Sequence, residues 1–277
     1  MKKLTHYTLL SVMGLLALSC NDDDNNTPET VTYDIEVKET TLGDVLTDDQ
    51  GMTLYFFTKD VDGNSTCTGN CLTNWPLFTK TTPTLDPSLD ASAFGTITHP
   101  SGSTQVTYRG WPLYYYAGDA AAGDVKGENV GKVWFVAKTD YSIMLADKQL
   151  VGNDGKNYLS DYTEGDGSTQ FLVDGQGRTL YGFVNDTKDK NNYTKEDFSN
   201  DGNWPIFSAD LESLPSTVDK TLFGEIDVFG KKQLTFKGWP LYYFGADSTT
   251  RGATKGVSVP RPGVWPILNL DTPEASE

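Results

Sequence analysis

The sequence predicts an all-β protein made of two tandem, homologous antiparallel β domains, each of which is an internal duplication. Three observations lead to this fold class. Turn-forming residues are abundant, with 27 glycines and 13 prolines among 277 residues. Long helical periodicity is missing beyond the N-terminus, and the sequence repeats itself at two levels. Each domain is expected to be a sandwich or a small barrel, and a single pseudo-fourfold β assembly is the alternative.

The longer repeat relates the two halves of the chain. The segment 48–60, DDQGMTLYFFTKD, aligns without a gap with 174–186, DGQGRTLYGFVND, and 105–119 aligns with 233–247. Repetition of this length indicates two copies of one structural unit. The tryptophans follow the repeat and are expected to fill matched core positions, in the pairs Trp75 and Trp204, Trp111 and Trp239, and Trp134 and Trp265.

A shorter pattern, Leu-Tyr-x-aromatic-x-x-Asp, occurs twice in each half. Successive side chains of a strand point to opposite faces, so the leucine lies on one face and the tyrosine and second aromatic on the other. We therefore expect these strands to be covered on both faces. The candidate structural or ligand-binding residues of the four copies are Tyr55, Phe57 and Asp60; Tyr114, Tyr116 and Asp119; Tyr181, Phe183 and Asp186; and Tyr242, Phe244 and Asp247.

The motif aspartate is expected to cap the turn that ends its strand, through local backbone hydrogen bonds. The alternative is that the four carboxylates converge on a metal ion or a ligand. A tyrosine hydroxyl five extended residues away would lie about 15 Å from the carboxylate, so pairing within one motif needs a bend.

The stretch Gly-Trp-Pro-Leu-Tyr occurs at 110–114 and again at 238–242. The glycine indicates a turn or bulge, and the proline cannot donate to a β ladder. We expect each stretch to start at a sheet edge, with Trp111 and Trp239 filling the core beside the motif leucines.

The N-terminus has the composition of a signal peptide. Lys2 and Lys3 precede an apolar stretch that is too short to span a bilayer comfortably. The sequence Ala-Leu-Ser-Cys that ends at Cys20 resembles a bacterial lipobox, whose cysteine carries lipid chains such as palmitate. Ordinary secretion with a stray cysteine is the alternative. Several acyl chains would hold the protein firmly at a membrane face.

The stretch NDDDNNTPET, residues 21–30, is expected to be a solvated spacer. It resembles the acidic stretch of surface-exported lipoproteins from some Gram-negative bacteria. This implies an outer-membrane lipoprotein exposed at the cell surface, with a periplasm-facing anchor as the alternative. The predicted parts of the chain are the signal peptide 1–19, the lipidated cysteine and acidic flexible linker 20–37, β repeat domain 1 at 38–147, β repeat domain 2 at 148–270, and the C-terminal tail 271–277.

Charge and cysteine content limit the possible partners. The net charge of -16 repels polyanions, so nucleic acid is excluded as a partner. In an oxidising compartment, Cys67 and Cys71 in their Gly/Asn/Thr turn are expected to form a local disulfide. A redox-active pair is the alternative.

The four motif copies, the Cys-x3-Cys…Trp-Pro element at 67–76 and the two Gly-Trp-Pro-Leu-Tyr stretches resemble the secreted-repeat lipoproteins, a family with a conserved Y-x-(F/W/Y)-x-x-D motif. The resemblance covers nearly all of the chain beyond the linker. It implies an envelope-anchored, non-enzymatic protein, in a family without an established molecular function. Some members accompany redox or metal-related proteins. The second half departs from the pattern, because Tyr193 and Phe198 lie where cysteines would be expected.

Catalytic signatures are scarce. His99 is the single histidine of the mature chain, which rules out a Ser-His-Asp triad in both domains and a multi-histidine metal site. We expect His99 at the surface or in a turn. The segment 60–64 imitates the start of a calcium loop but lacks the EF-hand spacing and its glutamate.

We therefore expect no enzymatic activity. The predicted function is that of a membrane-anchored envelope lipoprotein acting as a binding or interaction module. The alternatives are an envelope redox or metal/haem accessory protein and a surface carbohydrate-binding protein. No cofactor is predicted, with calcium or haem as weak alternatives. The expected partners are the membrane, through the lipid anchor, and an unknown protein or small-molecule ligand.

Overall fold

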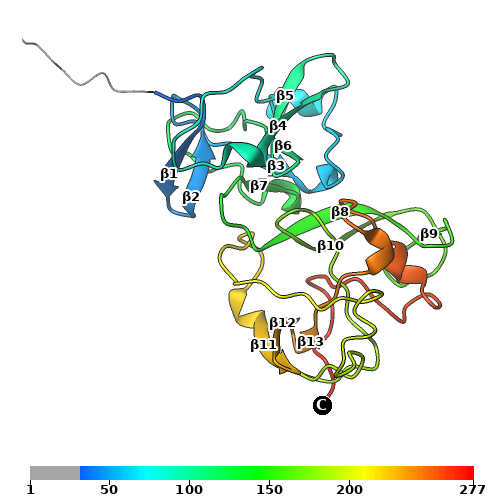
Figure 1. Cartoon of the computed structure of the whole chain (residues 1–277). Coiled ribbons are helices and arrows are strands. Elements are labelled where there is room, and N and C mark those ends of the chain that lie inside the picture. Colours follow the sequence, from blue (N-terminus) through cyan, green and yellow to red (C-terminus); the bar gives the residue numbers. More distant parts are fainter. Residues whose placement is uncertain (1–31) are drawn as a thin grey trace, which may run out of the picture. The chain divides into compact units, whose positions relative to one another are not determined.

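The computed structural model describes residues 32–277, of which Tyr33–Glu277 form one compact unit (Figure 1). The predicted signal peptide, Cys20 and the stretch 21–30 lie outside the described residues. The predicted all-β class is confirmed. Antiparallel sheets of two or three strands make up the fold, and in the described part of the chain none of them closes into a barrel. The helical elements are one short α-helix and isolated 3-10 turns.

The first half consists of two small sheets and a strand pair. They are the hairpin β1–β2, the sheet β4–β5–β6 and the pair β3–β7. The strands are β1 Glu36–Thr40, β2 Gly43–Thr47, β3 Tyr55–Phe57, β4 Phe94–Thr98, β5 Thr104–Tyr108, β6 Trp111–Pro112 and β7 Trp134–Val136. The helical elements are η1 Thr58–Asp60, α1 Cys71–Asn74, η2 Ala91–Ala93 and η3 Val130–Lys132.

The second half repeats this plan. The sheet β10–β8–β9 corresponds to β1–β2, and β11–β12–β13 corresponds to β4–β5–β6. The strands are β8 Ile143–Val151, β9 Asn157–Tyr158, β10 Ser168–Asp174, β11 Phe223–Val228, β12 Lys231–Phe236 and β13 Trp239–Pro240. The helical elements are η4 Lys220–Leu222, η5 Gly245–Asp247 and η6 Lys255–Ser258.

A ring of three backbone hydrogen bonds joins each motif leucine to its surroundings. Leu46 N donates to Ala137 O at 2.8 Å, Ala137 N to Leu54 O at 2.8 Å, and Leu54 N to Leu46 O at 2.9 Å. A buried backbone needs such partners for every amide and carbonyl. The same ring recurs three times, at Phe78, Leu113 and Val106; at Leu268, Leu180 and Leu172; and at Leu241, Leu234 and Phe207.

These rings divide the chain into four modules, each comprising a hairpin, a motif and a later tryptophan segment. In every ring, two residues come from the hairpin and motif of one module. The third residue lies three positions after a tryptophan of the other module in the same half. Ala137 follows Trp134, for example, and closes the ring of Leu54. The two modules of each half have therefore exchanged their tryptophan segments, and neither can close alone.

Three predicted boundaries differ from the structure. Ile35 is fully buried and β1 starts at Glu36, so the fold begins inside the predicted linker 20–37. The predicted junction between residues 147 and 148 falls within β8. The predicted tail 271–277 is docked, since Ala275 N donates to Lys237 O at 2.9 Å. Burial and backbone pairing decide these limits, and neither follows from the repeat alignment.

The two halves also share a hydrophobic core. Phe56, Trp111 and Phe135 of the first half belong to the same buried cluster as Ile143 and Tyr181 of the second. Apolar area removed from water on both sides of the junction favours the packed state. The halves are thus homologous units of one folded body.

The Gly-Trp-Pro stretches lie at sheet edges, as predicted. The glycines take left-handed φ values of 78° at Gly110 and 80° at Gly238, which complete the turns from β5 to β6 and from β12 to β13. The prolines end the two-residue strands β6 and β13. Trp111 is buried as predicted, whereas Trp239 is only half-buried and donates its indole N–H to Pro273 O at 2.9 Å.

Candidate functional site

The motif tyrosines and aspartates form crossed pairs between the two modules of each half. Each tyrosine hydroxyl donates to the aspartate of the other motif copy, never to its own. The four pairs are Tyr55 to Asp119 at 2.7 Å, Tyr114 to Asp60 at 2.5 Å, Tyr181 to Asp247 at 2.5 Å, and Tyr242 to Asp186 at 2.8 Å. Sequence analysis missed this pairing, because nothing in a single motif indicates which copy supplies the partner.

A backbone contact holds each crossed pair in register. Tyr55 N donates to Tyr114 O at 2.8 Å, and Tyr114 N donates to Tyr55 O at 2.9 Å. Tyr181 and Tyr242 make the same reciprocal contact, both at 2.9 Å. The two tyrosines lie side by side in antiparallel orientation. The aspartate of each motif therefore lies next to the tyrosine hydroxyl of the neighbouring strand.

The remaining carboxylate oxygen of each aspartate accepts a hydrogen bond from a backbone amide farther along its own loop. The distances are 2.8 Å from Thr66 N to Asp60, 2.9 Å from Lys126 N to Asp119, 2.7 Å from Asn192 N to Asp186 and 3.0 Å from Lys255 N to Asp247. The aspartates thus brace their turns, in keeping with the expected capping role. They also join two modules, which that role does not include.

Burial determines the electrostatics of these pairs. Burial raises the pKa of Asp60 and of Asp186 to about 6, and it raises the pKa of Asp119 and of Asp247 in the same direction. Burial, reinforced by the neighbouring carboxylate, also raises the pKa of all four tyrosines. The hydroxyls therefore stay neutral and act as fixed donors. Such closed pairs hold the structure together.

In each half, two tryptophans and the second aromatic residues of the two motif copies form one stack. Trp75 and Trp134 lie parallel with ring centroids 3.8 Å apart, and Phe57 and Tyr116 cover their outer faces at 4.1 and 4.5 Å. In the second half Trp204 and Trp265 lie 3.7 Å apart, between Phe244 and Phe183 at 4.4 and 4.3 Å. The four tryptophans are buried. Stacked and tilted contacts between aromatic rings add to the gain from apolar burial.

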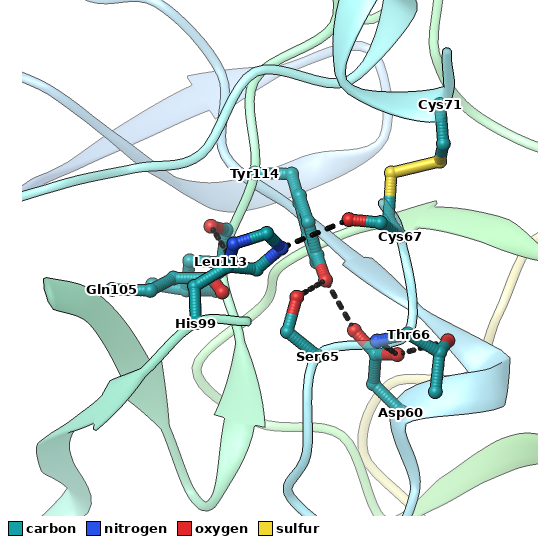
Figure 2. Close-up of a disulfide and its surroundings, with 9 residues drawn as sticks. All are labelled: Asp60, Ser65, Thr66, Cys67, Cys71, His99, Gln105, Leu113 and Tyr114. Carbon is teal, nitrogen blue, oxygen red and sulfur yellow. Dashed lines mark hydrogen bonds between the residues drawn. A yellow bond between two sulfur atoms is a disulfide. The ribbon is translucent and has the colours of Figure 1, made fainter. Parts of the chain in front are cut away.

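The predicted disulfide is present, and Cys67 and Cys71 lie 5.4 Å apart at Cα (Figure 2). In the second half, a hydrogen bond closes the equivalent loop. Trp75 N donates to Cys71 O, and its counterpart Trp204 N donates to Asn200 O, so Asn200 takes the place of Cys71. The predicted equivalence of Phe198 with that cysteine is wrong, because the second loop is longer.

Asn200 replaces the covalent link functionally as well. Its Nδ2 donates to Tyr193 O at 2.7 Å, and Tyr193 stands in the place of Cys67. The Tyr193 ring packs edge-on against Trp265 at 4.7 Å. Because the fold closes this loop in two chemically different ways, the disulfide is a local brace in the first half alone.

His99 lies in a turn, one of its two expected positions, and is buried there instead of lying at the surface. Its exposed fraction is 1%, and Nε2 lies 3.0 Å from Cys67 O (Figure 2). The ring ties the turn after β4 to the disulfide loop. The candidate calcium segment is likewise engaged, since Asp62 pairs with Lys148 at 2.7 Å. In residues 32–277, no three His, Cys, Asp or Glu side chains are grouped as ligands for a metal ion.

A groove of about 740 Å³ lies between the halves and contains residues that the sequence analysis did not select. Arg109, Thr107 and Gly95 line it from the first half, and Arg178 and Tyr243 from the second. The Arg178 guanidinium lies 4.1 Å from the Tyr243 ring and pairs with Asp174 at 2.8 Å. Arginine is rare in this chain. The position of Arg109 and Arg178 next to glycines expected in turns is the sequence feature that could have pointed to this groove.

Fold and site together define an all-β repeat protein whose repeated residues interlock its modules. Three segments of the chain, residues 36–79, 95–138 and 227–269, match the model of a family of secreted repeats of unknown function. Each match ends one residue after a ring position, at Phe78, Ala137 and Leu268. The module without a match has the long connection 152–167 between its hairpin strands. No curated protein and no solved structure shows significant similarity.

None of the helices in residues 32–277 has the length and apolar character needed to cross a bilayer.

Proposed function

We propose that the protein is a non-enzymatic envelope lipoprotein, anchored through Cys20, that serves as a binding or interaction module at the cell surface. The observation that carries this proposal is the closure of the motif residues on one another. Four tyrosines and four aspartates, the most repeated polar groups of the chain, are buried in pairs and brace the fold. They support a scaffold role, because catalysis needs a reactive group within reach of substrate.

Anchoring is supported by the N-terminal sequence. The lipobox-like residues that end at Cys20 precede an acidic stretch, 21–30, that suits a solvated spacer between a membrane and a folded unit. Placement at the outer membrane of a Gram-negative cell rests on the resemblance of this stretch to those of surface-exported lipoproteins. The folded unit begins at Tyr33, three positions after the last residue of this stretch.

The alternatives receive less support from the geometry. A redox role would rest on Cys67, which has an exposed fraction of 1% and whose partner is replaced by Asn200 in the second half. Carbohydrate capture by aromatic platforms would need exposed rings. The tryptophans of both stacks are buried against other aromatics.

Anchoring and exposure can be tested in cells that express the full chain. We expect labelled palmitate to be incorporated and the protein to fractionate with outer membranes, and Cys20→Ser should abolish both. Protease added to intact cells should degrade the wild-type protein, while a periplasmic marker stays intact as the control. Absence of palmitate from the wild-type protein would contradict lipid anchoring, and full protection from protease would contradict surface exposure.

A further inference from the structure

Three of the four arginines of this acidic chain meet at the groove between the halves. Arg109 and Arg178 line it. Arg251 lies behind it and donates through Nη1 to Arg109 O at 2.7 Å and also to Gln176 O. Two carboxylates share the groove. Asp174 is bound by Arg178 and by the Tyr243 hydroxyl at 2.7 Å, and Asp90 binds Ser92 with one oxygen. With two arginines and two aspartates, the lining of the groove is balanced in charge, in contrast to the net charge of -16 of the whole chain.

The second half contains the counterpart of the first-half wall of this groove. Gly224, Thr235 and Lys237 take the places of Gly95, Thr107 and Arg109 and line a smaller hollow. A Cβ added at Gly95 would lie 3.1 Å from Thr107 Oγ1, and one at Gly224 would lie 2.8 Å from Thr235 Oγ1. In both halves, therefore, glycine leaves the threonine hydroxyl accessible.

In the second half, a carboxylate of the protein occupies this hollow. Asp189 Oδ1 accepts a hydrogen bond from Thr235 Oγ1 at 2.9 Å, and Asp189 N donates to Gly238 O at 2.8 Å. The ungapped alignment of 60–66 with 186–192 places Gly63 where Asp189 stands. The first half therefore lacks this carboxylate. Among the described residues, Thr107 Oγ1 has no hydrogen-bond partner and Arg109 no ion-pairing carboxylate.

We propose that the groove binds a small molecule through its carboxylate, which takes in the first half the place that Asp189 takes in the second. Thr107 Oγ1 donates to this carboxylate, and Arg109 supplies the opposite charge. The lysine equivalent to Arg109 cannot serve in this way, because Lys237 Nζ is bound to Leu270 O at 2.7 Å and Thr272 O at 2.8 Å. A guanidinium and a hydroxyl together suit a carboxylate. The inference rests on the proposed role as a binding module and identifies its ligand class.

Two probes distinguish the sources of such a carboxylate, namely glucuronate for acidic sugars and N-acetyl-aspartate amide for acidic peptides. Binding of each to the purified protein is measured by titration calorimetry. Arg109→Gln should weaken binding at least tenfold. Lys237→Gln, at the equivalent position of the second half, is the matched control and should leave affinity unchanged. The methyl ester of glucuronate should not bind.

Gly63→Asp provides a second and independent test. The new aspartate should fill the groove as Asp189, which also has a positive φ of 52°, fills its counterpart. Binding should be abolished and a cooperative thermal transition retained, at a lowered melting temperature because Gly63 has a φ of 86°. Binding of one probe identifies the source, and binding of both means that the carboxylate alone is recognised. The inference is overturned if neither probe binds at millimolar concentration, or if Lys237→Gln weakens binding as much as Arg109→Gln. If binding fails in this way while palmitate is still incorporated, the proposed ligand class is wrong, and the proposal of a lipid-anchored module is not affected.

Discussion

The carboxylate of Asp60 illustrates what a repeated aspartate does in this protein. It is fully buried and accepts hydrogen bonds from Tyr114 Oη at 2.5 Å, from Thr66 N at 2.8 Å and from Thr66 Oγ1 at 2.6 Å. A buried polar group is costly to the fold unless its hydrogen bonds are made. The tyrosine therefore stabilises the fold by satisfying a carboxylate of the other module, as well as by burying its ring.

Tyr114→Phe should lower the free energy of unfolding by about 1–3 kcal/mol, because one oxygen of the buried Asp60 carboxylate loses its donor. Tyr116→Phe is the matched control. Tyr116 belongs to the same motif copy, packs in the aromatic stack, and its hydroxyl has no hydrogen-bond partner among the described residues. Urea melts of both variants measure the difference. Equal losses would mean that the hydroxyl bond contributes nothing specific.

The raised pKa values make stability depend on pH in a defined direction. Asp60 and Asp186 have a pKa of about 6 in the folded protein, raised from the ordinary value of 3.8 for an aspartate. The folded state binds these protons more tightly, so the stabilisation is complete below about pH 4 and is lost as pH rises through about 6. Asp34, with a pKa lowered to about 2 by Lys80, titrates below this window.

We therefore expect the urea midpoint to fall between about pH 4.5 and pH 7. Asp60→Asn removes one of the carboxylates with a raised pKa and should flatten the fall, although the variant itself is less stable. A midpoint that rises over this range, or an unchanged slope in the variant, would argue against a raised pKa in the folded state.

The loop between the motif and the next tryptophan is closed by a different chemical bond in each half. The first half closes it with the Cys67–Cys71 disulfide, and the second with the Asn200 side chain bound to Tyr193 O. Both devices place a tryptophan in the aromatic stack. The disulfide limits the unfolded chain, whereas the asparagine satisfies a backbone carbonyl in the folded one.

Cys67→Ser with Cys71→Ser should cost roughly 2 kcal/mol by the loop-closure estimate for so short a ring, without loss of the fold. Asn200→Ala should cost about 1–2 kcal/mol, because Tyr193 O and Lys195 N lose their partner together. Chemical denaturation of the oxidised protein and the variants provides the comparison. Failure of the double serine variant to fold would mean that the disulfide is essential.

The edge strands β6 and β13 place equivalent tryptophans in different surroundings. Trp111 packs against Phe56 at 5.0 Å and lies under the Arg251 guanidinium at 4.9 Å, whereas Trp239 is half-buried beneath the C-terminal residues. Trp111→Ala should therefore cost about 3–5 kcal/mol. Trp239→Ala should cost clearly less, which the same denaturant melts would reveal. A near-zero loss for Trp111→Ala would be incompatible with its core position.

At the scale of the whole molecule, the modules are joined first in pairs and then across the halves. Exchange of tryptophan segments and crossed tyrosine–aspartate pairs join the modules of each half. Phe56, Trp111 and the half-buried Arg251, which binds Val61 O at 2.9 Å, join the halves. Burial lowers the Arg251 pKa to about 10, which leaves the guanidinium charged at neutral pH. Its charge needs these carbonyl partners.

Residues 33–277 should consequently unfold in a single cooperative transition. Scanning calorimetry should give a calorimetric enthalpy equal to the van't Hoff enthalpy. Arg251→Met removes the polar link between the halves and keeps much of the side-chain volume, so it should lower the melting temperature or split the transition. Two resolved transitions in the wild-type protein would mean that the halves are independent domains.

Much of the fold follows from local pattern. The glycine and proline positions of 110–114 indicated an edge, and the duplicated motifs indicated duplicated strands covered on both faces, as Leu54 and Tyr55 are. The crossed pairs could not be predicted in this way. A motif of seven residues carries no information about which distant copy packs against it. The distance between the tyrosine hydroxyl and the aspartate of one extended motif excludes only a pair within that motif.

By itself, the sequence determined the all-β class, the number of repeats and the Cys67–Cys71 bond, because strand alternation, turn residues and short-range closure act between neighbours in the chain. Only the tertiary structure decided which tyrosine meets which aspartate, that His99 is buried, and that Arg109 faces a groove beside an unpartnered threonine. These features depend on contacts between distant segments, and such contacts arise from packing the whole chain into one core.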